Sequence, residues 1–143
     1  MSLFTNLFSL NMQGKSSGKK ETIVLVGAAK FEQEAVVDDR YQGILESMCG
    51  PRKPRSLNRF ETARLVLEER NPQAKNIVHI EIRGKQVGYL QPEDAVLYRR
   101  LLIARDMPNA TGECQAVIRG GWVSSDGRTG PYEVWLDLPS VNQ

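Results

Sequence analysis

Apolar and polar residues alternate along much of the chain with the two-residue period of a β-strand. In residues 77–82, Val78, Ile80 and Ile82 fall on one face, whereas His79 and Glu81 fall on the other. Residues 22–28 are a continuous β-rich run and predict a strand, and further strands are predicted over residues 31–37, 61–69, 86–90, 113–122 and 131–138. The short "RGK" sequence between two of these segments predicts a tight hairpin.

Two segments instead carry the period of a helix. In residues 40–50, Ile44, Leu45 and Met48 share one face, and a glycine followed by proline ends the pattern. A second helix is predicted to begin at Pro92, because proline lacks the N–H that would stay unpaired at the first helical position. The side chains predicted to be buried on this second helix are Val96, Leu97, Leu101 and Leu102.

The predicted strands follow one another through mostly short connections and do not alternate with helices. This order favours an antiparallel sheet, because parallel strands need long crossover connections. Gly88, Gly120 and Gly121 lie where strands are expected to bend, and closing a sheet removes its exposed edges. We therefore predict a mainly β fold with two helices (α+β), a small and partly closed antiparallel β-barrel of about six strands.

The chain has 143 residues, which is enough for one domain with a substantial core. We expect this domain to cover residues 21–143, because residues 1–20 differ in composition: Leu3, Phe4, Leu7 and Phe8 have helical spacing, and "GKSSGKK" is typical of a flexible linker. Three interpretations of this N-terminal tail stay open: a disordered tail, a segment docked on the domain or a partner, and weak membrane contact. A secretory signal is not indicated, since no basic residue precedes the apolar positions.

Positive charge is concentrated in two segments. The net charge is +2, to which residues 1–20 contribute +3 and residues 50–60 contribute +4. The remainder of the chain is therefore acidic, so any phosphate contact must depend on a local patch.

The two cysteines, Cys49 and Cys114, match no metal-ligand spacing and are expected to pack within the fold. So few cysteines favour a reduced, intracellular protein, and we expect a cytoplasmic location. No apolar run approaches the roughly 20 residues that cross a bilayer, so no membrane partner is expected.

The sequence shows no grouping of catalytic residue types. His79 is the single histidine, lies at a polar position within a predicted strand, and is expected to be solvated or hydrogen-bonded. Zinc sites built on paired histidines are therefore excluded. Neighbouring acids such as Glu68 and Glu69 point to opposite faces of a strand, and no phosphate-cradling glycine motif occurs. These features predict a binding module that is not an enzyme and has no catalytic residue, metal or cofactor.

Two features suit a nucleic-acid surface. Arg40 and Tyr41 place a cation beside an aromatic ring, which could hold a phosphate and stack a base for about 1–3 kcal/mol. The basic loop that follows contains Arg52, Lys53 and Arg55. Two simpler interpretations stay open: Tyr41 as a packing residue at the helix start, and the basic loop as a solvated surface.

The segment 63–95 carries the spacing "NP…N.V.I.G..VGYL…A", and "RYQGIL" precedes it at residues 40–45. This pattern resembles the HIRAN domain, which occurs in relatives of helicase-like transcription factor and as free-standing bacterial proteins. The resemblance covers residues 31–138, approximately. It implies a small OB-like barrel that binds single-stranded DNA, at a free 3′ end in the best-known members, beside repair or remodelling machinery.

Carried over by position, the resemblance implies that Arg40 and Tyr41 hold the terminal nucleotides and that Asn71 opens the family's Asn-Pro-Tyr-Asp motif. This chain has Gln73 and Ala74 in place of Tyr-Asp. Gln73 can only hydrogen-bond, and Ala74 can neither accept a terminal hydroxyl nor stack. Because a hydrogen bond to a charged group contributes about 1.5–3 kcal/mol, selectivity for a 3′ end is expected to be weakened or lost.

Two functions are expected from these features. The first is a single-stranded DNA-binding module, with possible 3′-end recognition, that uses the Arg40–Tyr41 pair, Asn71, Gln73 and the basic loop and acts with a helicase- or nuclease-type protein. The alternative is a protein-interaction adaptor that keeps the barrel and has lost DNA-end binding. The acidic remainder of the chain and the missing Tyr-Asp pair favour the alternative.

Overall fold

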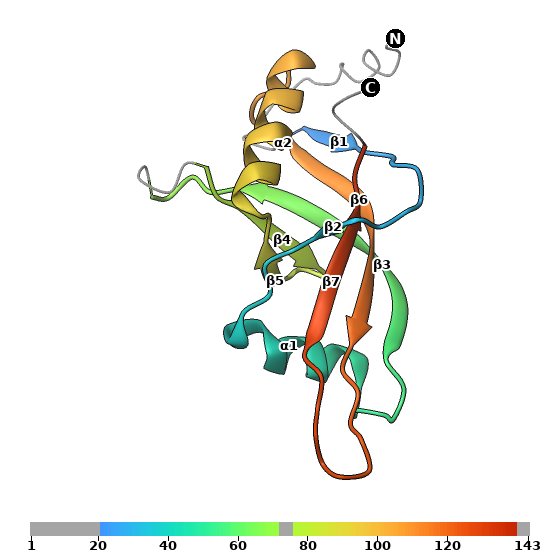
Figure 1. The fold of residues 1–143 in the computed structure, drawn as a ribbon. Coiled ribbons are helices and arrows are strands. Elements are labelled where there is room, and N and C mark those ends of the chain that lie inside the picture. The colour runs from blue at the N-terminus through green and yellow to red at the C-terminus, as the bar shows by residue number, and fades with distance from the viewer. Residues whose placement is uncertain (1–20, 72–75, 140–143) are drawn as a thin grey trace.

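The computed structural model describes residues 21–71 and 76–139. The N-terminal tail, Gln73 and Ala74 therefore lie outside the described residues, and the expectations that concern them remain sequence-based. The described strands are β1 (Thr22–Val24), β2 (Gln33–Glu34), β3 (Leu57–Leu67), β4 (Val78–Ile82), β5 (Lys85–Tyr89), β6 (Thr111–Gly120) and β7 (Tyr132–Asp137), and the helices are α1 (Asp39–Cys49) and α2 (Pro92–Ala104) (Figure 1).

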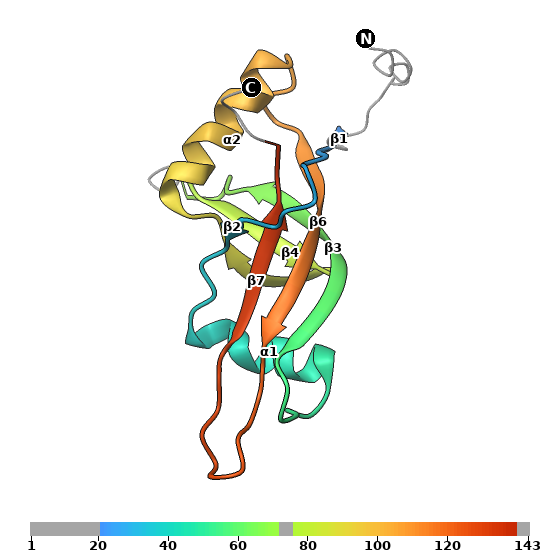
Figure 2. The same cartoon turned by 45° about the vertical axis from the view of Figure 1, so that its right-hand side comes forward.

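The strands form one curled sheet in the order β2-β7-β6-β3-β4-β5, in which every neighbouring pair is antiparallel. The short β1 pairs in parallel with the start of β6. Figure 2 shows how the long strands β3 and β6 curve together, so that the sheet wraps around its own inner face. The prediction of a mainly β, partly closed, OB-like barrel with two helices is confirmed.

The two ends of the strand order meet at one short segment of chain. Gln33 and Glu34 pair with β7, and two residues later Val36 exchanges backbone hydrogen bonds of 2.8 and 3.1 Å with Tyr89 of β5. Gly88 permits this approach, because a Cβ at that position would lie 2.5 Å from the Val36 carbonyl oxygen. The prediction of one continuous strand over residues 31–37 is therefore wrong: the segment changes partner midway.

The inner face of the sheet carries the core in the predicted alternation. Val78, Ile80 and Ile82 of β4 are each 0% exposed, and the apolar side chains of β3, β6 and β7 face them. The hairpin between β4 and β5 turns at Arg83 and Gly84, whose φ angles of 55° and 77° fit the two-residue turn that matches strand twist. This core fixes which side chains of β4 and β5 remain outside.

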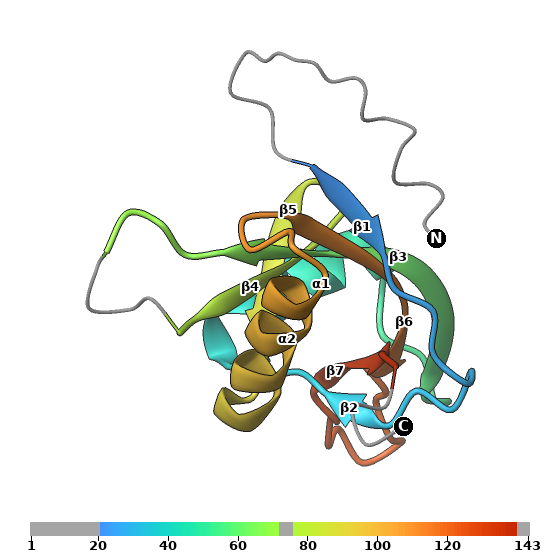
Figure 3. The same ribbon diagram turned by 90° about the horizontal axis from the view of Figure 1, so that it is seen from above.

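The helices cover the two ends of the barrel, α2 at the upper end and α1 at the lower end in Figure 1; Figure 3 shows the same arrangement from above. The predicted buried stripe of α2 is partly wrong, because Val96 is 38% exposed, whereas Tyr98 is buried. Gly112 of β6 makes room for the Tyr98 ring, since a Cβ there would lie 2.6 Å from its hydroxyl oxygen. The residues of α2 that are buried are Ala95, Tyr98 and Leu102.

Candidate nucleic-acid interface

The first turn of α1 fastens this helix to two strands that are far apart in the sheet order. The Gln42 side chain pairs with the backbone of Tyr132 in β7, accepting its N–H at 2.8 Å and donating to its carbonyl at 3.0 Å. The adjacent Tyr41 accepts a hydrogen bond of 2.8 Å from Gln86 of β5. Neighbouring residues of "RYQG" therefore bind opposite sides of the barrel, which places Arg40 at an outer corner beside β5.

Arg40 is the most available group at this corner, with 66% of its side chain exposed. Its guanidinium carbon lies 5.0 Å from the centre of the Tyr41 ring, and it donates to Asp38 at 2.8 Å. Asp38 also caps α1 by accepting the Arg40 backbone N–H. The hydrogen bonds from Arg40 hold the pKa of the Asp38 carboxyl below its usual value, so this pair stays ionised at neutral pH.

Tyr41, in contrast, is only 8% exposed, and burial raises the pKa of its hydroxyl. The guanidinium of Arg40 lies against its ring. A base therefore has no open tyrosine face to stack on at this position, and the packing interpretation of Tyr41 is the one that fits its burial. Tyr41 supports the corner from beneath.

Tyr89 is a half-buried tyrosine at the same corner that the sequence did not indicate as a site residue. It lies close enough to interact electrostatically with both Arg40 and Tyr41. The register of β4 and β5 shifts at Ile80, so that Gln86 faces Glu81 whereas Tyr89 faces His79. This irregularity puts Gln86 and Tyr89 on the same outer face although they are three residues apart, which alternation alone could not reveal.

A chain of hydrogen bonds runs across the outside of β5, β4 and the end of β3. Gln86, which donates to Tyr41, also lies 2.7 Å from Nδ1 of His79. The other ring nitrogen, His79 Nε2, lies 2.6 Å from Glu68 Oε1. The expectation that His79 is hydrogen-bonded is confirmed at both ring nitrogens. The bond from His79, together with backbone N–H donors, lowers the pKa of the Glu68 carboxyl.

Asn71 lies at the far end of this polar chain. Its backbone N–H donates to Glu68 Oε2 at 3.2 Å, and the N–H of Arg70 donates to the same oxygen at 2.8 Å. The structure therefore connects Asn71 to the corner of Arg40 and Tyr41 through named contacts, and it leaves Asn71 exposed. Gln73 follows just beyond, outside the described residues.

The basic loop is not part of this corner. It follows the C-terminal end of α1, whereas Arg40 lies at the N-terminal end, and the 11 residues of the helix separate the two by about 16 Å. Arg52 is used internally: its guanidinium lies 4.8 Å from the centre of the Tyr132 ring and donates to the Gly130 carbonyl. The side chains of Lys53 and Arg55 are exposed.

A second outer surface was missed by sequence reasoning. The registers of β3, β6 and β7 align Phe60, Val117 and Trp135 in one row across the outside of the sheet, which we call the aromatic row. Phe60 is 59% exposed, and Phe31 meets it edge-on at 5.4 Å. No local pattern could join these residues, because 57 positions separate Phe60 from Val117.

The two surfaces differ in their charged groups. Beside the aromatic row, Arg119 lies 5.3 Å from the centre of the Trp135 ring, and the indole N–H donates to Glu133 at 3.0 Å. At this surface, the guanidinium of Arg119 in β6 therefore lies against the Trp135 ring of β7. The same strand, β7, also carries the Glu133 carboxylate.

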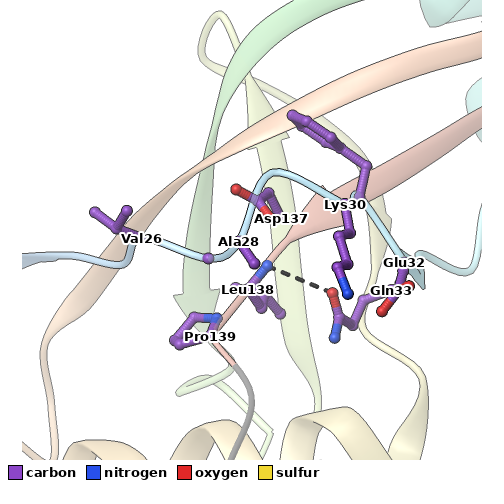
Figure 4. Close-up of a pocket in the computed structure, with 10 residues that line it drawn as sticks. Val26, Ala28, Lys30, Glu32, Gln33, Asp137, Leu138 and Pro139 are labelled. Carbon is purple, nitrogen blue, oxygen red and sulfur yellow. Dashed lines mark hydrogen bonds between the residues drawn. The ribbon is translucent and has the colours of Figure 1, made fainter.

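A pocket of about 440 Å³ lies between the β1–β2 connection and the end of β7 (Figure 4). The carboxylate of Asp137 lines it and accepts the Ala29 backbone N–H at 2.9 Å, and Gln33 accepts the Leu138 N–H at 3.4 Å. Its charged lining groups have opposite signs: Lys30 against Glu32 and Asp137. Across residues 21–71 and 76–139, no three His, Cys, Asp or Glu side chains gather to hold a metal ion.

No helix in the described part of the chain is long and apolar enough to cross a membrane. No family model, no curated protein and no solved structure matches this chain. The HIRAN resemblance therefore rests on the sequence pattern alone.

Proposed function

We propose that this protein is a non-enzymatic module that binds single-stranded DNA at the corner formed by Arg40, Tyr41 and Tyr89. The observation that supports this most directly is the Arg40 side chain, which is 66% exposed and whose guanidinium contacts Asp38 and the Tyr41 ring. A positioned cation beside an accessible aromatic group is how single strands are bound without base-specific contacts.

The roles at the corner differ from those implied by the resemblance. Arg40 contacts the DNA backbone, and the half-buried Tyr89 offers the aromatic surface that the buried Tyr41 does not. Asn71 contacts the strand from the far end of the polar chain, and Gln73 is assigned to the same side by its position in the sequence. Arg52 is occupied by Gly130, so Lys53 and Arg55 are left as a separate, weaker phosphate contact.

Fluorescence anisotropy with single-stranded oligonucleotides tests the proposal. We expect binding that weakens with salt, because each phosphate contact releases counterions. A Kd weaker than about 100 µM at moderate salt, the weak limit of non-specific binding, would sink the proposal. We further propose that the protein acts inside the cell, in the cytoplasm, beside DNA repair or remodelling machinery that includes a helicase- or nuclease-type protein.

Oligonucleotides with free and blocked 3′ ends test the end-binding part of the proposal. We expect little discrimination in the natural chain, because Gln73 and Ala74 replace the Tyr-Asp pair. The substitution Ala74→Asp is expected to raise the preference for a free 3′ hydroxyl. An unchanged preference in this variant would mean that the carry-over by position is wrong.

A protein-interaction adaptor is the second candidate, and the aromatic row favours it. Aromatic and arginine side chains are enriched at the centres of protein interfaces, and the exposed Phe60 together with the half-buried Trp135 and Arg119 supplies both types. This function predicts a stable complex with a protein partner. The complex should persist after nuclease treatment and should be lost in Phe60→Ser. The same partner should be retained in Arg40→Ala, which separates the adaptor from the DNA-binding module.

A further inference from the structure

The polar chain on the outside of the barrel has a defined direction. A carboxylate only accepts hydrogen bonds, so the 2.6 Å contact between Glu68 Oε1 and His79 Nε2 places a proton on Nε2. In the neutral ring, Nδ1 is then an acceptor and receives one N–H of the Gln86 amide at 2.7 Å. The other N–H of that amide donates to the Tyr41 hydroxyl oxygen at 2.8 Å, which leaves the hydroxyl proton of Tyr41 free to point elsewhere.

Protonation of His79 reverses this direction. A proton on Nδ1 would place two hydrogen-bond donors in contact, His79 Nδ1–H and the N–H of the Gln86 amide. Rotation of this amide by 180° replaces its N–H donor with its oxygen acceptor and restores a hydrogen bond. The Gln86 oxygen then accepts from His79, and the Tyr41 hydroxyl must donate inward to the same oxygen. The proton added to the imidazole comes from solvent, and no other covalent bond forms or breaks.

We propose that His79 and Gln86 are positioning residues that set whether the Tyr41 hydroxyl acts as a hydrogen-bond donor or acceptor towards a strand bound at Arg40. With neutral His79, the hydroxyl donates to a DNA phosphate or sugar oxygen beside the guanidinium. With protonated His79, the hydroxyl offers only lone pairs, which a phosphate repels. The part of this inference that concerns the ligand rests on the proposed function.

The charged and titratable groups around His79 come from four elements, and on β3 they include Arg64, which pairs in register with Glu81. The charge of Glu68 at the end of β3 is shared with two backbone N–H donors. Glu81 follows on the same face of β4, and Tyr89 faces His79 from β5. The groups contributed by α1 are Tyr41, through Gln86, and Arg40 above it.

The added charge and the reversed hydroxyl act in opposite directions. A cationic imidazole by itself would attract phosphate and tighten binding at low pH. The loss of the Tyr41 donor weakens binding by about tenfold, the contribution of one hydrogen bond to a charged group. The sign of the pH dependence therefore distinguishes the positioning role from simple electrostatics.

The free protein provides the first measurement, which does not depend on DNA. His79 is the only histidine, so its two ring nitrogens can be assigned in a ¹⁵N NMR spectrum without ambiguity. We expect the Nε2–H tautomer at high pH, and a change in the Gln86 side-chain amide signals that follows the His79 titration. The Nδ1–H tautomer, or amide signals that do not respond, would overturn the inference whether or not the protein binds DNA.

The second measurement is the affinity for a single-stranded oligonucleotide between about pH 8 and about pH 5.5, the range in which histidine ordinarily changes charge. The affinity of the natural chain should weaken by about tenfold as pH falls. Tyr41→Phe should bind weakly at every pH, because it lacks the donor. Gln86→Met should keep the high-pH affinity of the natural chain across the range, because no amide then forces the Tyr41 hydroxyl to donate inward. Tyr132→Phe is the matched control, because it removes a tyrosine hydroxyl near the other end of α1, 3.4 Å from the Gly50 carbonyl. This control should keep the natural pH profile.

The two measurements separate the possible failures. Tighter binding at low pH, or the same pH profile in Tyr41→Phe as in the natural chain, contradicts the positioning role even if DNA binds well. Absence of DNA binding at every pH contradicts the proposed function, and the NMR titration then still decides whether protonation of His79 turns the Gln86 amide.

Discussion

Two arginine–tyrosine pairs lie near the two ends of α1, and they differ in function although their geometry is similar. Arg40 lies 5.0 Å from the Tyr41 ring at the start of the helix, and Arg52 lies 4.8 Å from the Tyr132 ring beyond its end. Both tyrosines are buried. The two pairs differ in the acceptor that each guanidinium binds. Arg40 donates to the carboxylate of Asp38 at the surface, whereas Arg52 donates to the buried carbonyl of Gly130.

This difference shows that a cation over an aromatic ring does not by itself indicate a ligand site. Arg52 fastens the loop after α1 to the turn before β7, so removing its charge would leave a buried carbonyl without its donor. Arg40 is paired with Asp38 on the surface, where ion pairs contribute little to stability, so it can exchange Asp38 for a phosphate. The comparison predicts that the two pairs respond differently to substitution.

The largest effect is expected for Tyr41→Ala. Tyr41 is 8% exposed, so truncating it should lower the free energy of unfolding by about 3–5 kcal/mol, as for other buried aromatic residues. Urea denaturation measures this loss. Phe60→Ala is the control, because its ring is 59% exposed and should cost less than about 1 kcal/mol. Equal and small losses of unfolding free energy in both variants would contradict the burial of Tyr41 and support its interpretation as an exposed ring on which a base stacks.

Arg52→Ala is expected to destabilise the fold by about 1–2 kcal/mol, because it removes both packing on Tyr132 and the bond to the Gly130 carbonyl. The affinity for single-stranded DNA should change little. Denaturation and anisotropy on the same preparation provide both numbers. A stable variant with strongly reduced DNA affinity would show that the basic loop, and not the Arg40 corner, carries the binding site.

Arg40→Ala should give the opposite result. We expect DNA affinity to fall by about tenfold, with the slope of log K against log salt reduced by about 1, and the unfolding midpoint to stay unchanged. Arg119→Ala, which removes the arginine beside the aromatic row, is the matched control and should retain the affinity. Equal losses in the two variants would point to unspecific attraction by the whole surface.

The smallest effect concerns acid stability. The pKa of Glu68 is lowered in the fold by the bond from His79, so the ionised carboxylate stabilises the folded state. This contribution is complete above about pH 4.3, the ordinary value for glutamate, and disappears as pH falls further. Glu68→Gln should therefore show a shallower loss of stability between neutral and acidic pH. A curve parallel to that of the natural chain would mean that Glu68 is not coupled to His79.

Much of the fold followed from local pattern. The alternation in β4, the tight turn at Gly84 and the proline start of α2 are decided by neighbouring residues, and all three are present in the structure. Tyr98 was not anticipated as a buried residue of α2, because the space that accepts its ring is created by Gly112, on another strand. The sequence pattern of a helix identifies its apolar face, but the strand that packs against the helix determines which residues at the edge of that face are buried.

The candidate site was predicted less completely than the fold. Arg40 and Tyr41 were identified from residue type, yet the burial of one and the exposure of the other depend on where α1 meets β5. Tyr89 and Gln86 were missed as members of the site, because a register shift between β4 and β5 brings them to the same face. Such a shift depends on the pairing of two strands and leaves no mark in the alternation of either.

The sequence by itself determined most of the strands, the helix starts and the mainly β architecture, because side-chain alternation, turn residues and helix caps act within a few residues of one another. Only the tertiary structure decided which arginine of the two arginine–tyrosine pairs is exposed. Strand register, barrel closure at Val36 and the attachment of α1 through Gln42 bring together residues that are distant in the chain. These contacts occupy Arg52, bury Tyr41 and leave Arg40 exposed over the Tyr41 ring, and Gln86 links the Tyr41 hydroxyl by hydrogen bonds to His79.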